Sequence, residues 1–172
     1  MVSQLAETTV KKEKLEVSEE RLKTANANLL DEISERERAQ EALKESEEKF
    51  RSIVENSHNG IAILDDKYRV VYINNELCRI IEYLPEELID QDFDKYMSEE
   101  GFKIISGQDT ISENDEKAMS NSEFKMIRKG GEERDVEARG SVITDSAGNM
   151  RTIVQILDIT ARKLAREWQK QQ

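Results

Sequence analysis

The sequence predicts an α+β domain that is preceded by one long helix and followed by the start of another. Residues 1–49 contain no Gly, Pro, Phe, Tyr or Trp, whereas short apolar segments separated by turn residues begin at Ile61. A chain of 172 residues is long enough for one compact domain with an extended appendage, but short for two complete cores. We therefore expect a coiled-coil helix over 1–49, a domain over 50–160 and the beginning of an output helix over 161–172.

The first segment has the composition and the periodicity of a coiled coil. It is rich in Glu, Lys, Arg, Leu and Ala, which favour helix, and leucines recur at heptad spacing from Leu15 to Leu29. The pattern predicts a coiled-coil homodimer, because an exposed leucine stripe on a helix of about 75 Å needs a partner helix. A single helix held by i,i+4 ion pairs, with its leucines folded onto its own domain, is the alternative. The predicted seam consists of Leu15, Leu22, Asn26, Leu29, Ile33 and Leu43.

Five strands and several short helices account for the central segment. Two short strands are expected at 61–64 and 70–73, and Asn74 is placed to cap the helix that follows them. Pro85 opens a further helical turn, and the polar residues 98–122 predict one helix and a loop. Three more strands are expected at 124–128, 136–143 and 151–157, joined by turns at Gly130-Gly131 and at 145–149.

The final strand is apolar on both faces. Ile153 and Leu157 lie on one face, and Val154 and Ile156 lie on the other. A sheet with one solvated face would show a polar side instead. We therefore expect a flanking helix or a second protomer to cover the second face.

The segment after the last strand is expected to join the sheet to the final helix. Thr160 is placed to cap that helix, and Asp158 lies near its positive end, where a carboxylate is stabilised. With Ile159 between them, these residues are candidates for signal coupling between sheet and helix. The alternative is an ordinary strand-to-helix cap that has no coupling role.

Composition argues against several classes of function. The formal net charge is −11, so phosphate backbones would repel the chain and no nucleic-acid partner is expected. One cysteine and one histidine cannot build an internal disulfide or a zinc site of several Cys or His ligands. No segment approaches the roughly 20 apolar residues of a membrane span, so we expect a cytoplasmic protein without direct membrane contact.

Catalytic chemistry is not predicted either. The single histidine, His58, lies in Asn56-Ser-His-Asn-Gly60 at a turn into the first strand, and no glycine-rich nucleotide loop accompanies it. The sequence offers no paired set of catalytic side chains. We expect that this chain is not an enzyme and holds no metal.

Four segments carry a resemblance to the PAS sensor family, over about residues 44–163. They are Glu45-Ser-Glu-Glu-Lys-Phe-Arg51, Val71-Tyr-Ile-Asn74, Glu87-Leu-Ile89 and Asp158-Ile-Thr160. The resemblance implies a five-stranded antiparallel sheet with short helices on one face. It also implies a sensor whose flanking helices pass a conformational signal to an output domain, commonly a histidine kinase of a two-component system. Because relay helices in series must enter and leave the domain together, we expect the homodimer to be parallel. A free-standing dimerisation or interaction protein without a ligand is the alternative function.

The resemblance also guides what we expect of cofactors. Cys78-Arg-Ile-Ile differs from the motif of flavin-binding relatives, and residues 91–124 lack the histidine that haem-binding relatives usually place there, so neither group is expected. A small organic ligand beside the fourth strand is one expectation, and a space filled by neighbouring side chains is the other. The candidate pocket wall is Val136, Ala138, Gly140 and Val142.

The sequence departs from the family at three turn positions. Tyr68 lies in the first hairpin turn, and Glu82 and Asp90 stand near the short helices where glycine is common in the family. We therefore expect the loops at these positions to be shaped differently.

Overall fold

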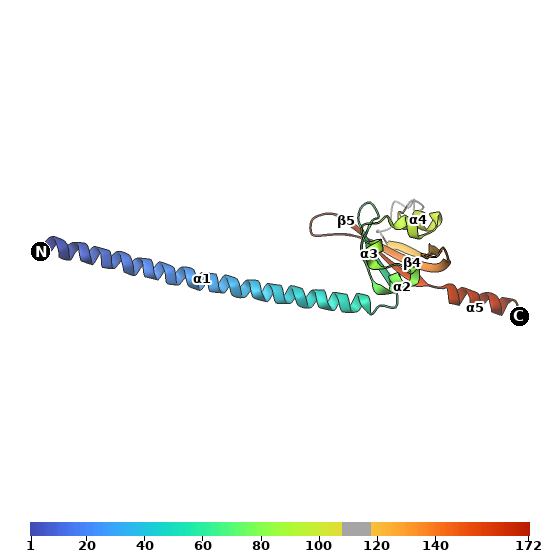
Figure 1. Ribbon diagram of the computed structural model, residues 1–172, viewed down its shortest axis with the longest axis horizontal. Helices are drawn as coiled ribbons and strands as arrows, with labels where there is room; N and C mark the ends of the chain where they lie inside the picture. Colours follow the sequence, from blue (N-terminus) through green and yellow to red (C-terminus); the bar gives the residue numbers. More distant parts are fainter. Residues whose placement is uncertain (108–117) are drawn as a thin grey trace. The chain divides into compact units, whose positions relative to one another are not determined.

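The computed structural model describes residues 1–107 and 118–172, which form two compact units, Met1–Arg51 and Ser52–Gln172 (Figure 1). Helix α1 (Val2–Glu55) makes up the first unit apart from Met1, and its last turn belongs to the second. This continuous helix confirms the prediction made from the missing Gly, Pro and aromatic residues. Nearly all side chains of the first unit are exposed, so helix propensity rather than burial stabilises it within one chain.

The second unit is an α+β domain built on a five-stranded antiparallel sheet of strand order β2-β1-β5-β4-β3, which confirms the predicted fold class. Its strands are β1 (Gly60–Leu64), β2 (Val70–Ile73), β3 (Ala118–Ile127), β4 (Glu133–Thr144) and β5 (Met150–Asp158). Its other helices are α2 (Asn75–Ile81), α3 (Pro85–Leu88), the 3-10 helix η1 (Phe93–Tyr96), α4 (Glu99–Ile105) and α5 (Thr160–Lys170).

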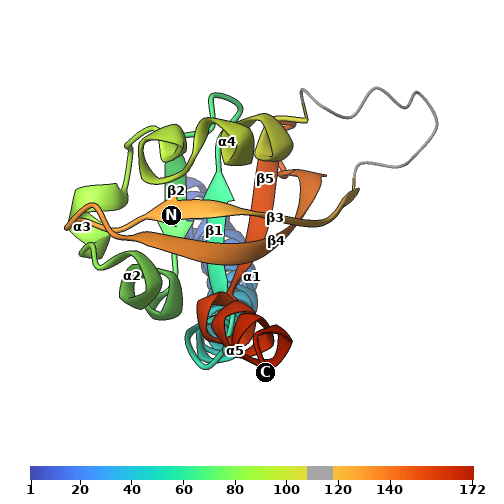
Figure 2. The ribbon, with the colours of Figure 1, turned by 90° about the vertical axis from the view of Figure 1, so that its right-hand side faces the viewer.

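The first and last strands meet at the centre of the sheet, because β1 pairs with both β2 and β5. β4 lies between β5 and β3, so the last three strands follow one another as hairpins. Gly131 and Gly148, in the two connecting turns, have φ angles of 86° and 85°, which glycine adopts without steric strain. The sheet is strongly twisted, since β1 and β5 run upright in Figure 2 while β3 and β4 cross the view.

The hydrophobic core lies between one face of the sheet and the short helices. Alternate residues of the strands face it, and Ala62 and Leu64 of β1 and Val154 and Ile156 of β5 are fully buried. Burial of this apolar surface fixes the short helices, which are too short to be stable alone. The helices and their connections contribute Leu77, Ile80, Ile81, Leu88, Phe93, Tyr96, Met97 and Ile105.

Helix α2 approaches β1 closely at a glycine. A Cβ atom added to Gly60 would lie 2.9 Å from the Cβ of Leu77, which is nearer than non-bonded carbon atoms pack. Asn74 begins the helix, because its Oδ1 accepts a hydrogen bond from the N–H of Leu77 over 3.1 Å. The polar cap and the missing side chain of Gly60 together place the apolar face of α2 against the sheet.

Among the described residues, three other than glycine adopt the left-handed backbone conformation. The φ angle is 60° at Tyr68, 63° at Glu82 and 63° at Asp90. Each of these residues has the backbone conformation that glycine favours. A loop shape that differs from other members of the family stays a prediction.

Part of the polar segment 98–122 is helical, as predicted. The Oγ of Ser98 accepts a hydrogen bond from the N–H of Gly101 over 3.2 Å and caps α4. β3 begins at Ala118 rather than at residue 124. The predicted loop falls largely on residues 108–117, which lie outside the described residues.

Across residues 1–107 and 118–172, no helix has both the length and the apolar composition needed to cross a membrane. In the same described ranges, no group of three or more His, Cys, Asp or Glu side chains is placed to hold a metal ion.

Candidate functional site

The candidate coupling residues lie at the junction between β5 and α5, where hydrogen bonds join them to Asp135 at the start of β4. The N–H of Ile159 donates to the carbonyl of Asp135 over 2.9 Å. The Oγ1 of Thr160 accepts from the N–H of Asp135 over 3.1 Å, and donates to its carbonyl over 3.4 Å. Since Ile159 is also buried, the start of α5 is fastened to the sheet by packing and by three hydrogen bonds.

Thr160 does not cap α5 in the way the sequence predicts. Helix α5 begins at Thr160 itself, and its N-cap residue is Ile159, whose apolar side chain makes no cap hydrogen bond. The Thr160 hydroxyl bonds to the main chain of Asp135 instead. The carboxylate of Asp158 accepts the N–H of Thr160 over 2.9 Å. Asp158 therefore satisfies one of the free N–H groups that begin a helix.

Asp135 is the residue of this site that sequence reasoning missed. It is 25 positions away from Thr160, so no local motif connects the two. The pairing of β4 with β5 brings them together, since the next residue of β4, Val136, lies opposite Asp158. Knowledge of the strand register would have identified Asp135, and composition alone could not.

Charged side chains also tie the first turns of α5 to the sheet. The Nζ of Lys163 lies 2.9 Å from Oε2 of Glu123 in β3 and 3.1 Å from Oδ1 of Asp135. Arg162 pairs with Glu137 of β4 over 2.9 Å. The hydrogen bonds that the ammonium group of Lys163 donates to the carboxylates of Glu123 and Asp135 raise the pKa of Lys163. Partly exposed ion pairs of this kind are individually weak, but here they restrict the direction in which α5 leaves the sheet.

A second junction joins the end of α1 to the β2–α2 connection. The Nδ2 of Asn74 donates to the carbonyl of Val54 over 2.9 Å. The carboxylate of Glu55 accepts from the Tyr72 hydroxyl over 2.8 Å and from the N–H of Asn75 over 3.0 Å. The sequence identified Asn74 as a helix cap, but its bond to α1 depends on tertiary structure.

The candidate pocket wall lies on the inner face of β4. Val136 and Ala138 belong to the hydrophobic core, Gly140 is buried and Val142 is half-buried. The alternation along β4 places the four residues on one face, next to core side chains. A ligand bound there stays a prediction.

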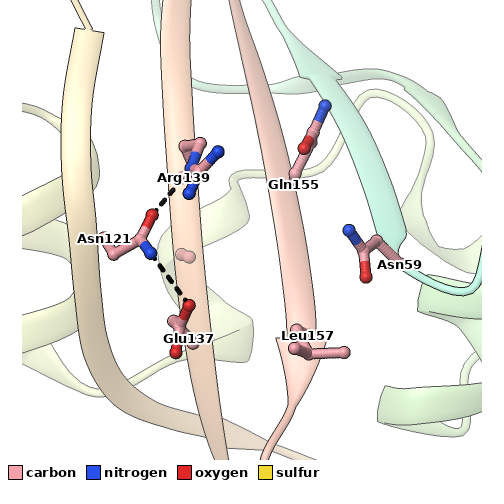
Figure 3. A pocket seen from close by; sticks show the side chains of 7 residues that line it. Asn59, Asn121, Glu137, Arg139, Gln155 and Leu157 are labelled. Atoms are coloured by element: carbon pink, nitrogen blue, oxygen red, sulfur yellow. Dashed lines mark hydrogen bonds between the residues drawn. The ribbon is translucent and has the colours of Figure 1, made fainter.

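The outer face of the sheet carries an open, largely polar groove of about 230 Å³ (Figure 3). At its edge, Oδ1 of Asn121 accepts from Nε of Arg139 over 2.6 Å, and its Nδ2 donates to Oε1 of Glu137 over 3.1 Å. An apolar ligand would find little apolar surface in this groove, and the polar groups at its edge already bond to one another. The groove is lined by Asn59, Asn121, Glu137, Ala138, Arg139, Gln155 and Leu157.

The second face of β5 is partly open. Val154 and Ile156 are buried in the core, whereas Ile153 is half-buried and Leu157 is exposed. That a helix or another protomer covers this face stays a prediction.

The single cysteine and the single histidine of the chain lie in different environments. Burial raises the pKa of the Cys78 thiol to about 11, so the nucleophilic thiolate is scarce near neutral pH. His58 is exposed at the turn before β1.

The predicted coiled-coil seam is accessible along α1. Ion pairs between residues four apart are also present, from Arg36 to Glu32 over 2.8 Å and from Lys49 to Glu45 over 3.6 Å. Each of Leu15, Leu22, Leu29, Ile33 and Leu43 has between 50% and 63% of its own surface exposed, and Asn26 is exposed as well. The dimer itself stays a prediction.

Comparison with known proteins identifies the family. The family model described as PAS fold matches residues 48–159, and this chain therefore belongs to the PAS family. The PAS domain of an HTR-like protein from Haloarcula marismortui is 20% identical, with a TM-score of 0.61, and the match covers 72% of this chain and 99% of that one. A search of the curated proteins gave no match.

Two other solved PAS domains have the same fold. One is from a two-component sensor histidine kinase, with 18% identity, a TM-score of 0.53 and coverage of 67% of this chain and 98% of that one. The other is from nitrogen regulation protein NR(II) of Vibrio parahaemolyticus, with 18% identity, a TM-score of 0.51 and coverage of 63% and 96%.

Proposed function

We propose that this chain is a non-catalytic, dimeric sensor and relay module that passes a conformational signal from its PAS core through the flanking helices to an output domain such as a histidine kinase. Membership of the PAS family supports the sensory role. The similar PAS domain from a two-component sensor histidine kinase supports the choice of output. The module would act in the cytoplasm without direct contact to nucleic acid or membrane.

The observation that carries this proposal is the bonding of the β5–α5 junction to Asp135. Ile159 and Thr160 both bond to its main chain. If β4 shifts along β5, these hydrogen bonds must stretch or α5 must move with the strand. A change in the core would therefore reach α5 through β4.

The exposed leucine stripe of α1 supports a parallel dimer. Leu22 and Leu29 lie on one face of a helix that is otherwise strongly charged, and a second copy of the helix would bury them. Asn26 lies between them in the predicted seam, where a polar residue favours a two-stranded state. In a parallel pair both copies of the PAS domain follow the coiled coil on the same side, which is what a relay in series needs.

A kinase chimera tests the coupling. Residues 1–172 are fused to a histidine kinase output region, and autophosphorylation is compared for wild type, Asp158→Ala and Thr160→Ala. We expect both variants to change kinase output by about tenfold while the fold is retained. Thr144→Ala, at the far end of β4, is the matched control and should leave output unchanged. Unchanged output in both junction variants would reject the relay.

A cysteine cross-link tests the dimer. Asn26→Cys in a Cys78→Ala background should form a disulfide-linked dimer on mild oxidation, because a parallel register brings the two copies of position 26 together. Asn28→Cys, outside the seam, is the control and should react far more slowly. A monomer by native mass spectrometry would reject the coiled coil, and the same spectrum would reveal any small molecule retained in the core.

A further inference from the structure

Helix α2 is fastened at its C-terminal end by the β3–β4 hairpin. The last carbonyl groups of a helix have no partner within the helix. Here the Nε of Arg128 donates to the carbonyl of Ile80 over 2.9 Å, and the N–H of Lys129 donates to the carbonyl of Ile81 over 3.1 Å. Both donors follow β3 directly, and the turn of the hairpin lies beside α2 and α3 in Figure 2.

The guanidinium of Arg128 is held in place from several directions. Its Nη1 lies 2.8 Å from the carboxylate of Glu82 and 3.2 Å from that of Glu132, and only 13% of the side chain is exposed. Glu82 has the left-handed backbone that ends α2. A planar guanidinium can bond a carbonyl and a carboxylate at once through fixed donors, which a lysine ammonium cannot reproduce.

The N-terminal end of the same helix is fastened to α1. Asn74 caps α2 and bonds to the carbonyl of Val54, while Glu55 accepts the N–H of Asn75. Helix α2 is therefore bonded to the end of α1 at one terminus and to the β3–β4 hairpin at the other. Its middle packs on β1 through the close contact of Leu77 with Gly60.

The same hairpin holds α5. Lys163 bridges Glu123 of β3 and Asp135 of β4, and Asp135 also bonds to Thr160. Hydrogen bonds and ion pairs thus connect the hairpin to helices on both sides of Arg128. On one side lies α2 with the end of α1, and on the other lies the strand pair that carries α5.

We propose that Arg128 is a positioning residue that makes α2 and the β3–β4 hairpin move together, so that a displacement of α2 reaches α5 through β3 and β4. This inference deepens the proposed relay and rests on it for its biological meaning. Helix α2 is then the element whose displacement is transmitted. Arg128 is the residue that couples the β3–β4 hairpin to this displacement.

Hydrogen exchange of the full chain tests the proposal without an output domain. Arg128→Lys keeps the positive charge but loses the fixed donors to Ile80 and Glu82. We expect amide exchange to rise about tenfold in the last turn of α2 and several-fold in the first turn of α5. Arg139→Lys, on the outer face of β4 and bonded to Asn121, is the matched control and should leave α2 unchanged.

Amide exchange at Val154 and Ile156 in β5 distinguishes local opening of α2 and α5 from unfolding of the whole domain. These two amides should keep the wild-type exchange rate in Arg128→Lys. Faster exchange in α2 with unchanged exchange in α5 would overturn the proposal, as would an equal rise at every amide.

If Arg128→Lys does not fold, Thr160→Val carries the same test in reverse, because coupling is reciprocal. It should speed exchange in α2, and unchanged α2 would overturn the proposal.

Failure of this inference is distinguishable from failure of the relay. If Arg128→Lys changes exchange in α5 but the junction variants leave kinase output unchanged, the mechanical coupling stands and the relay function is rejected. If the junction variants change output but Arg128→Lys leaves α5 unaltered, the relay stands and its signal does not travel through α2.

Discussion

The side-chain amide of Asn74 donates a hydrogen bond over 2.9 Å to the main-chain carbonyl of Val54, 20 residues earlier in the chain. The same amide donates to Asn59 over 3.0 Å, and its oxygen accepts from Ile61 over 2.8 Å and from Leu77 over 3.1 Å. A fully buried side chain that uses both donors and both acceptor positions in this way fixes three elements at once. Asn74 is therefore the point at which α1, β1 and α2 are held together.

Replacement of Asn74 should be among the most damaging changes in the domain. In Asn74→Ala four main-chain partners lose their hydrogen bonds, of which those of Val54 and Leu77 are buried. We therefore expect the free energy of unfolding to fall by about 3 kcal/mol. Urea denaturation followed by circular dichroism measures this loss. Asn75→Ala, at the exposed neighbouring position, is the control and should change stability by less than about 0.5 kcal/mol. Similar losses in both variants would contradict the role of Asn74.

The contact of Gly60 with α2 makes a second prediction. A methyl group at Gly60 would meet both the Cβ of Leu77 at 2.9 Å and its Cα at 3.0 Å, so the helix must move rather than one side chain. Gly60→Ala should lower the free energy of unfolding by about 1–3 kcal/mol. Gly130→Ala is the matched control, since an added Cβ there meets nothing within 4 Å. Equal melting temperatures for Gly60→Ala and wild type would show that α2 does not pack as described.

The left-handed residue Asp90 offers a change that should stabilise the protein. Its φ angle of 63° costs an L-residue about 1–2 kcal/mol, while glycine loses about 0.5–1 kcal/mol more on ordering. Asp90→Gly should therefore raise the free energy of unfolding by about 0.5 kcal/mol. Asp66→Gly, at an exposed turn position without positive φ, should lower it by a similar amount. Chemical denaturation of the pair measures the sign, and a loss in Asp90→Gly would contradict the strain.

Local sequence signals were sufficient for most elements, although not for η1 or for the first residues of β3, and they did not reveal the connections between elements. The absence of glycine and proline predicted α1, and alternation from Ile61 onwards predicted the strands, because both signals are carried by neighbouring residues. Asn74 was recognised as a cap from its own neighbourhood. The bonds of Thr160 to Asp135 and of Arg128 to Ile80 join residues 25 and 48 positions apart. Only the strand register and the packing of α2 bring those pairs together.

Thr160 illustrates why the site was only partly predicted. A threonine before a helix is an ordinary N-cap candidate, yet its hydroxyl is occupied by the main chain of Asp135. The sequence could not reveal this competition, because it depends on which β4 residue lies opposite the end of β5. The carboxylate of Asp158 takes the helix N–H instead, so both residues matter for a different reason than expected.

The single cysteine provides the last prediction, a pH dependence. Burial raises the pKa of Cys78 to about 11, against about 8.5 for an ordinary thiol. Because only the thiolate reacts, labelling of the native protein should be slow at pH 8 and should rise about tenfold per pH unit up to about pH 10. An ordinary thiol levels off above about pH 9 instead. The rate of reaction with a thiol-specific chromogenic reagent measures this.

Two controls separate the pKa from simple access to the thiol. Labelling in urea should become fast and follow an ordinary thiol, because unfolding removes the burial that raises the pKa. Ser146→Cys in a Cys78→Ala background places a thiol in the exposed turn between β4 and β5, and it should react in the folded protein as it does in urea. Rapid labelling of native Cys78 at pH 8, while the domain stays folded, would mean that α2 opens readily and does not keep Cys78 buried.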